Sequence, residues 1–367
     1  MKNRLLTLFA VAVCAILPAL SSCEKEFNPL AEYKDITIVY GLVNPVDTTH
    51  YLRIHKAFLG PGDIILMAKE PDSSLYPVED IDVRVFDIDE KGNSTRLPVR
   101  IENKGGKDST GYFYAPTQRV YCFDKIFETS YGDVYRPENI IKVEIENKKT
   151  GKIVYAQTSL VHSFNVKAPI RNAALDLDPK KASGLFIWNN AKNGRIYDVY
   201  YTMRYREGLR KDSSSFIYER KSITWHVGSC SARATGTEKI ETQNFNFNPG
   251  AFYGQIMRDI PYDESVWRMP YDSVSIAIWC GSEDLYYYHN INKPSQGIAQ
   301  ERPEFTNMKT KIYSEELGDY KEIEGEAYGI FSSRIVQYVI PLHLSADMTQ
   351  KHLPATNRQF SGVAYKD

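Results

Sequence analysis

Alternation of apolar and polar residues over short segments is the feature that most restricts what this chain can fold into. In Ile81–Val85, for example, Asp82 and Arg84 alternate with aliphatic residues. Successive side chains of a β-strand point to opposite faces, so this period of two indicates a strand with one buried face. Such strands follow one another at hairpin spacing, which predicts an immunoglobulin-like β-sandwich over residues 34–165. Its expected strands lie at 36–42, 50–58, 80–88, 95–101, 111–116, 118–123, 140–146 and 152–159.

The alternation stops between residues 166 and 184, and we interpret this stretch as a linker. Residues 185–367 would then form a second β-rich domain. Its first two segments, Leu185–Trp188 and Ile196–Tyr205, resemble the second and third strands of a fibronectin-like sandwich. The predicted fold class is therefore mainly β, with two β-sandwich-like domains. Further strands are expected at 218–226, 273–280 and 329–342, and short helices near 248–260, 282–292 and 345–353.

Composition agrees with this fold class and excludes one class of partner. The chain has 26 Tyr, 16 Phe and 4 Trp among its 367 residues, and aromatic residues favour strands. Lys and Arg number 45 against 46 Asp and Glu, which leaves a net charge of −1. A nucleic-acid-binding protein needs a basic surface to neutralise phosphates, so we expect no nucleic-acid partner.

The N-terminus has the pattern of a bacterial lipoprotein. Lys2 and Arg4 precede an apolar run, Leu5–Leu20, that is shorter than a membrane-spanning helix, so residues 1–22 are interpreted as a signal peptide. The run ends in Leu20-Ser21-Ser22-Cys23, which resembles a lipobox. The resemblance implies an acylated Cys23 that anchors the protein to a membrane through residues 23–33. The alternative is an ordinary signal peptide in which Cys23 is incidental.

The residues after this cysteine bear on which side of the membrane the protein faces. Glu24, Lys25 and Glu26 resemble the acidic signal that sends lipoproteins of the Bacteroidota to the cell surface. The other interpretation is a solvated linker that leaves the protein facing the periplasm.

Three cysteines remain after the anchor: Cys122, Cys230 and Cys280. An odd number permits at most one disulfide bond in an oxidising compartment. Cys230 and Cys280 both end strand-like segments, so a bond between them is one hypothesis. The other is that all three are small buried apolar residues.

Eight short segments follow one another along the mature chain: 36–42, 78–83, 111–113, 143–145, 150–152, 155–158, 302–307 and 329–334. In this order they resemble a family of Bacteroidota outer-membrane lipoproteins that is known only as a domain of unknown function. The resemblance implies an immunoglobulin-like first domain. Because family members are often encoded beside TonB-dependent outer-membrane receptors, it also implies an accessory or partner role at the cell surface. It assigns no catalytic residues.

Motifs for known chemistry are missing from the sequence. There is no nucleophile elbow, phosphate-binding loop, dinucleotide fingerprint or zinc-ligand spacing, so we expect no catalytic residue, metal or cofactor. Glu301 and Glu304 could act as an acid and a base if they lined a cleft. The simpler interpretation places them in a solvated loop, paired with Arg302.

Aromatic residues in the second half are the best candidates for a binding face. Tyr286, Tyr287 and Tyr288 lie on a predicted helix, where successive side chains point about 100° apart, so that at least one should be exposed. With Trp267, or with Trp225 or Trp279, they could form a platform that binds a sugar or a protein. The alternative is that these rings fill the sandwich core.

These observations leave three functional hypotheses. The first is a non-enzymatic, lipid-anchored outer-membrane protein that binds a partner, such as a TonB-dependent receptor complex. The second is a surface lipoprotein that binds a polysaccharide or nutrient through exposed aromatic residues. The third, a lesser alternative, is an extracellular hydrolase.

Overall fold

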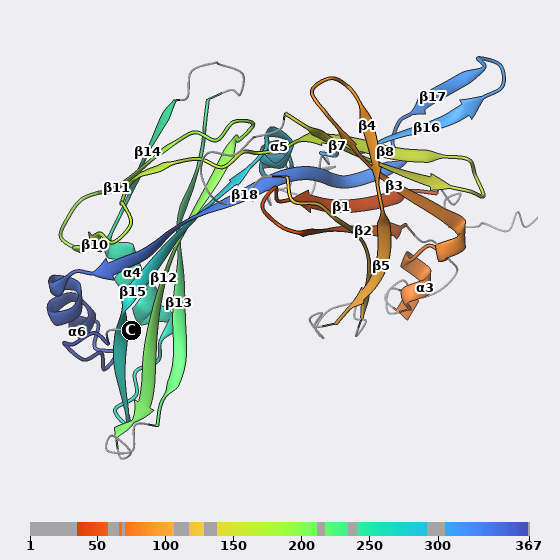
Figure 1. Cartoon of the computed structure of the whole chain (residues 1–367). Helices are drawn as coiled ribbons and strands as arrows, with labels where there is room; N and C mark the ends of the chain where they lie inside the picture. Colours follow the sequence, from red (N-terminus) through yellow and green to blue (C-terminus); the bar gives the residue numbers. More distant parts are fainter. Residues whose placement is uncertain are drawn as a thin grey trace, which may run out of the picture.

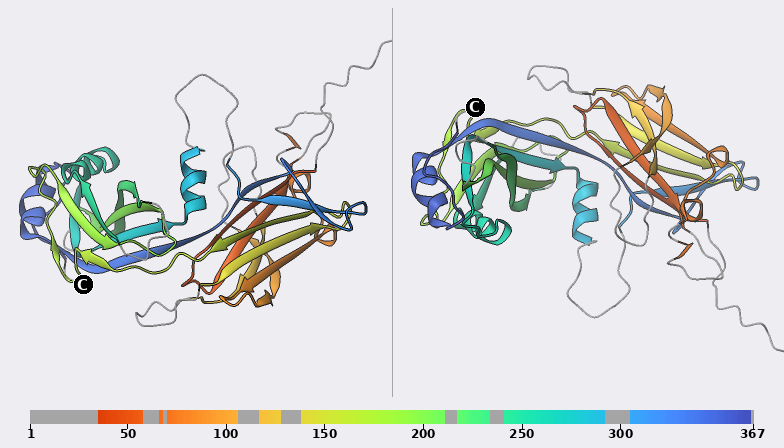
Figure 2. Two further views of the ribbon diagram at one scale, coloured as in Figure 1. Left: turned by 90° about the horizontal axis from the view of Figure 1, so that it is seen from above. Right: turned by 90° about the horizontal axis from the view of Figure 1, so that it is seen from below.

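The computed structural model describes residues 35–57, 66–67, 70–105, 117–127, 138–210, 217–233, 241–291 and 305–365. Two β-rich lobes lie side by side, and one long strand runs from the first lobe into the second (Figures 1 and 2).

The first lobe is a sandwich of two sheets. One sheet has the spatial order β17 (Asp319–Ile323), β16 (Lys309–Ser314), β8 (Ile153–Ser159), β7 (Ile140–Asn147), β3 (Ile81–Ile88) and β4 (Ser94–Leu97). The other contains β1 (Thr37–Val43), β2 (Thr49–Lys56), β6 (Gln118–Asp124) and β5 (Val99–Lys104). Short helical turns, α3 (Pro71–Ser74) and η2 (Val78–Asp80), precede β3.

Alternation produces the core of this lobe as the sequence predicts. In β3 the buried residues Ile81, Val83 and Val85 face inward, and β7 contributes Ile141 and Val143 in the same way. Together with residues of β1, β2 and β6 they form one hydrophobic cluster between the two sheets. Burial of each such side chain contributes about 1.5–3 kcal/mol, which makes the inner faces the main source of stability.

The second lobe also has two layers. Its larger sheet contains β13 (Glu219–Ser231), β12 (Ile196–Leu209), β15 (Val266–Gly281), the second half of β18 (Ala327–Leu344) and the short β10 (Ala174–Leu175). Opposite it lie β14 (Thr242–Phe247), β11 (Gly184–Asn189) and β9 (Val166–Ala168). Helical segments occur near the three predicted places: α4 (Gly250–Asp259), α5 (Glu283–Ile291), and the π-helical Met348–His352 followed by α6 (Leu353–Ala355).

An aromatic cluster fills the core of the second lobe. Trp188 of β11 lies 5.4 Å from Tyr197 of β12, and Tyr201 meets Phe252 of α4 edge to face at 4.9 Å, both measured between ring centroids. These rings are almost completely buried. The core cluster of this lobe contains Tyr197, Tyr201, Tyr205 and Tyr253. The predicted mainly β class with β-sandwich-like domains is confirmed.

β18 belongs to both lobes. Its residues Ala327–Ser333 pair in parallel with β1 of the first lobe, and Arg334–His343 pair antiparallel with β15 of the second. β16 and β17 likewise join the first lobe through β8. The division that assigns all of 185–367 to the second domain is therefore wrong for residues 309–333, because periodicity reveals a strand but not the strand with which it pairs.

The two cysteines proposed for a disulfide bond lie on either side of β12. Cys230 of β13 and Cys280 of β15 are both opposite Tyr197, one on each flank. Neighbouring strands are about 4.8 Å apart, which places the two Cα atoms about 9.6 Å apart, beyond the reach of a disulfide bond. Cys122, Cys230 and Cys280 are all free thiols, so the hypothesis of a bond between Cys230 and Cys280 is wrong.

Candidate functional site

A groove lies on the outer face of the larger sheet of the second lobe. In β15 the apolar residues Val274, Ile276 and Ile278 face the core, so that Ala277 and Trp279 face outward. The groove has a volume of about 670 Å³. Its lining residues come from both lobes and from α5: Leu42, Ile196, Asp198, Tyr200, Thr202, Thr224, Ala277, Trp279, Cys280, Gly281, Leu285, Tyr288, His289, Arg334 and Tyr338.

The register of three strands creates the hollow. Ala277 lies opposite Tyr200 of β12 on one side and opposite Tyr338 of β18 on the other. Tyr338 is 51% exposed. The small alanine side chain leaves a depression between two tyrosines that stand two strands, about 9.6 Å, apart. In the next row Trp279 lies between Asp198 and Val336, so it forms a wall at one end of the depression.

Helix α5 limits the groove at the junction between the lobes. It follows β15 directly and contributes Leu285, Tyr288 and His289 to the lining. The Leu285 side chain of this helix packs directly over Gly281, where a Cβ would lie 2.5 Å from Cδ2 of Leu285. Figure 2 shows α5 standing between the two lobes, beside β18.

Asn307 connects helix α5 to strand β18 through hydrogen bonds. Its Nδ2 donates to Asp284 Oδ2 of α5 at 2.9 Å and to the backbone oxygen of Phe331 in β18 at 2.7 Å. The backbone N–H of Phe331 donates in return to Asn307 Oδ1 at 3.0 Å. Burial raises the pKa of Asp284, which makes its hydrogen bond to Asn307 the principal compensation for the buried carboxyl.

Arg334 provides a cation at the edge of the groove. Its guanidinium carbon lies 4.8 Å from the centroid of the Trp279 ring, within the range of a cation–π interaction. Among the residues that the structure describes, no carboxylate lies within ion-pair distance of Arg334.

Asp198 supplies the acidic group. Its Oδ1 accepts a hydrogen bond from Ser229 Oγ at 2.5 Å and lies 3.4 Å from His226 Nε2. The His226 ring also packs against Tyr200, with centroids 4.9 Å apart. Burial, and secondarily Asp198, raise the pKa of Tyr200, so its hydroxyl remains a neutral hydrogen-bonding group.

The Ser229, His226 and Asp198 side chains are not arranged as a hydrolytic triad. In a triad the serine and the carboxylate contact different nitrogens of the imidazole, which can then move a proton between them. Here Ser229 Oγ and Asp198 Oδ1 both lie near His226 Nε2, at 3.3 and 3.4 Å. The arrangement fixes Asp198 at the groove and does not activate Ser229.

The structure places the residues of the predicted aromatic face in different surroundings, although the rings of Tyr286 and Tyr287 contact each other with centroids 5.4 Å apart. Tyr288 lines the groove, whereas Tyr286 lies against Arg195 at 4.9 Å and Tyr287, 41% exposed, packs near Phe305. Trp267 lies on β15 opposite Gly208, twelve residues before Trp279 and thus about 40 Å away along the strand. The expectation that Trp267 joins the three tyrosines in one face is therefore wrong.

The other tryptophans have different roles. Trp225 is buried and packs against Phe252 of α4. Of the three tryptophans considered together with the tyrosines, only Trp279 lines the groove.

Three residues of the groove, Tyr200, Arg334 and Tyr338, were not predicted from the sequence. Their outward positions could have been found from the alternation in β12 and β18, but their proximity depends on a pairing that the sequence does not reveal.

Several predicted features lie outside the described residues. These are Cys23, Glu24, Lys25 and Glu26 of the anchor and export signal, the strand expected at 111–116, and the Glu301 and Glu304 pair. In the described part of the chain no group of His, Cys, Asp and Glu side chains could hold a metal ion, and no helix is long and apolar enough to cross a membrane.

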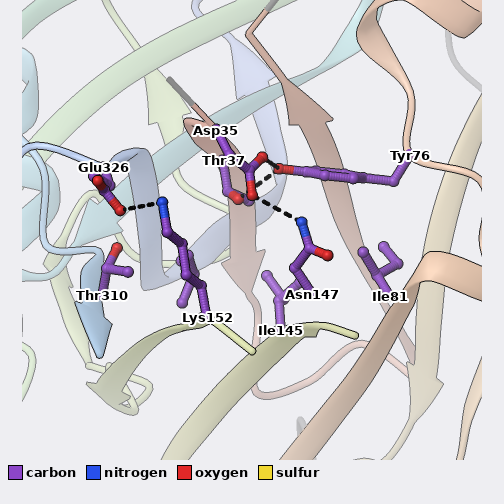
Figure 3. A pocket seen from close by; sticks show the side chains of 10 residues that line it. Asp35, Thr37, Tyr76, Ile81, Ile145, Asn147, Lys152, Thr310 and Glu326 are labelled. Atoms are coloured by element: carbon purple, nitrogen blue, oxygen red, sulfur yellow. Dashed lines mark hydrogen bonds and ion pairs between the residues drawn. The ribbon is translucent and has the colours of Figure 1, made fainter. Parts of the chain in front are cut away.

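A second, much smaller cavity lies in the first lobe (Figure 3). Its volume is about 10 Å³, which is room for about one water molecule. Asp35 accepts hydrogen bonds from Tyr76 at 2.9 Å and from Asn147 at 2.8 Å, and Lys152 pairs with Glu326 at 2.7 Å. These bonds tie the start of β1 to β7, so we interpret the cavity as part of the scaffold.

Comparison with known proteins adds little. No family model and no curated protein matches the chain. Among solved structures, a mutant of the CFA/I adhesin CfaE of enterotoxigenic E. coli aligns over 86% of this chain and 94% of its own, at 8% identity and a TM-score of 0.14. A likeness this weak carries no information about fold or function.

Proposed function

We propose that this chain is a non-enzymatic, lipid-anchored outer-membrane protein that faces the cell surface and binds a polysaccharide in the aromatic groove. The anchor and the orientation rest on Cys23 and on the Glu24, Lys25 and Glu26 segment of the sequence. The binding role rests on the geometry of the second lobe.

The observation that carries the binding role is the row Tyr200–Ala277–Tyr338 with Trp279 beside it. A pyranose ring has an apolar face of C–H groups, which packs against aromatic rings, and a rim of hydroxyls, which needs polar partners. Ligand sites in proteins combine a mainly apolar lining with a few polar groups in the same way. Here Asp198, His289 and Arg334 are the polar groups.

The test is affinity electrophoresis of the full chain, purified in detergent, through gels that contain a panel of soluble polysaccharides. We expect retardation by at least one of them, and we expect Trp279→Ala to abolish it. Tyr313→Ala, an exposed tyrosine of the first lobe, serves as the matched control and should be retarded like the wild type. The proposal would be overturned if Trp279→Ala were retarded as strongly as the wild type. It would also be overturned if no polysaccharide retarded the wild type.

A second candidate role is that of an accessory subunit of a TonB-dependent receptor. The hairpin β16–β17 projects from the first lobe (Figure 1). It exposes Tyr313, Tyr320 and, at its tip, Leu317, which is 64% exposed. Tyrosines and aliphatic residues on a projecting element are typical of protein–protein contacts.

The two roles can be separated by affinity purification from solubilised outer membranes. An accessory subunit should co-purify with a β-barrel receptor identified by mass spectrometry, and Leu317→Asp should lose that receptor while Trp279→Ala keeps it. If the receptor co-purified with Leu317→Asp, or if no receptor co-purified with the wild type, this second role would be contradicted. The first role would be unaffected.

A further inference from the structure

We infer that the groove selects saccharides that carry an anionic group, a carboxylate or a sulfate, and that Arg334 is the residue that selects them. The inference rests on the proposed saccharide-binding function and names the ligand class of the same site.

Arg334 differs in its surroundings from Arg84 and Arg268. Arg84 pairs with Glu146 at 2.8 Å, and Arg268 pairs with Glu207 at 2.6 Å. The guanidinium of Arg334 lies instead over the Trp279 ring, without a carboxylate partner among the described residues. Its charge is available to a ligand in the groove.

The acidic residue of the groove cannot neutralise Arg334. Asp198 is on β12 and Arg334 is on β18, with β15 between them, so that at least about 9.6 Å separates their strands. Asp198 is also occupied by Ser229 and lies near His226. Among the described lining residues it is the one carboxylate, and it is placed to accept hydrogen bonds from sugar hydroxyls on the far side.

The contact with Trp279 prepares Arg334 for this role. Stacking on a ring restricts the rotamers of the long side chain, so less conformational entropy is lost when a ligand binds. The guanidinium is planar, and its N–H donors can form two parallel hydrogen bonds with a carboxylate or a sulfate.

Matched pairs of saccharides test the inference by isothermal titration of the full chain. One pair consists of oligogalacturonides and their methyl esters, and the other of sulfated galactan oligosaccharides and their desulfated forms. Within each pair the sugar backbone is the same and only the charge differs, and the two pairs distinguish carboxylate from sulfate. We expect the wild type to bind the anionic member of at least one pair about tenfold more tightly than the neutral member.

Substitutions assign this preference to Arg334. Arg334→Gln should reduce the ratio of the two affinities to about one, whereas Arg334→Lys should keep part of it because the charge remains. Tyr338→Ala should weaken both members of a pair alike. The preference should also decrease at high salt, since Arg334 lies at a partly exposed edge.

The outcomes separate this inference from the function on which it rests. Equal binding of anionic and neutral members by the wild type, or an unchanged ratio in Arg334→Gln, overturns the inference and leaves saccharide binding in place. If the wild type binds no member of either pair and no polysaccharide of the panel, both the function and the inference fail.

Discussion

The guanidinium of Arg334 lies 4.8 Å from the ring centroid of Trp279, and these two residues come from the neighbouring strands β18 and β15. Arg334 is the first residue of β18 that pairs with the second lobe, directly after the segment that pairs with β1. The groove therefore forms at the place where β18 leaves one lobe and enters the other, and its geometry depends on how that strand is held.

Gly329 is the position where this dependence can be tested. Its φ is +104°, and a Cβ there would lie 1.9 Å from the carbonyl oxygen of Val39 in β1. Gly329→Ala should force β1 and β18 apart and lower the free energy of unfolding by about 2–4 kcal/mol. The measurement is urea denaturation of the full chain.

The control for that experiment is Gly254→Ala. Gly254 lies inside α4, and a Cβ there has no neighbour within 4 Å. Alanine is the better helix former, so this variant should gain up to about 1 kcal/mol. A Gly329→Ala variant that unfolds at the wild-type urea concentration would contradict the account of the junction.

Asn307→Ala should loosen α5 and weaken the groove. The substitution removes the donor to the half-buried Asp284 and both hydrogen bonds to the backbone of Phe331. We expect a loss of about 1–3 kcal/mol in the free energy of unfolding. Because α5 carries Tyr288 and His289, saccharide affinity should also fall. Unchanged affinity in a destabilised Asn307→Ala variant would show that α5 does not shape the site.

His50 predicts a pH dependence of stability in the first lobe. Burial lowers the pKa of His50 below its usual 6.5, and its Nε2 lies 2.7 Å from the backbone oxygen of Lys125. Below pH 6.5 the unfolded chain binds a proton that the folded chain does not bind. The free energy of unfolding should therefore decrease as the pH falls from 6.5 towards the lowered pKa.

The measurement is urea denaturation at pH 7.5 and pH 5.5 for the wild type and for His50→Gln, whose amide can still hydrogen-bond to Lys125. The variant should lose less stability between the two pH values than the wild type. An equal loss in both proteins would mean that His50 does not contribute.

Cys23→Ala tests the anchor. Without an acylated cysteine the protein should move from the membrane fraction to the supernatant, because acyl chains supply its membrane affinity. Protease treatment of intact cells should degrade the wild type if it faces outward. Continued sedimentation of Cys23→Ala with membranes would contradict the anchor, and full protection from protease would contradict the orientation.

The alternation of apolar and polar residues within single segments predicts most of the strands. It does not predict the groove, which depends on how distant strands pair. The sequence predicts the bounds of β3 and β7 to within one residue, and the alternation in β3 also predicts its buried face, because each strand buries one face whatever its partners are. The position of β18 in two lobes could not be predicted, since its residues 327–333 and 334–343 pair with strands that are far apart in sequence.

The same reason explains the errors at the site. The sequence proposes Tyr288 because three successive tyrosines on a helix cannot all face inward, and it groups Trp267 with them because both kinds of residue are aromatic. Their separation follows from the length of β15, which runs from Val266 to Gly281 and carries Trp267 to the far end of the sheet. Tyr200 and Tyr338 become neighbours of one alanine only after three strands have paired.

The most direct measurement is isothermal titration of a saccharide identified in the electrophoresis panel into Ala277→Leu. A leucine at position 277 would fill the space between Tyr200 and Tyr338, and its side chain would point away from the core. The account predicts at least about a tenfold loss of affinity and an unchanged denaturation midpoint. Ser273→Leu, on the same face of β15 but outside the groove, should bind like the wild type. Wild-type affinity in Ala277→Leu would contradict the assignment of the groove as the binding site.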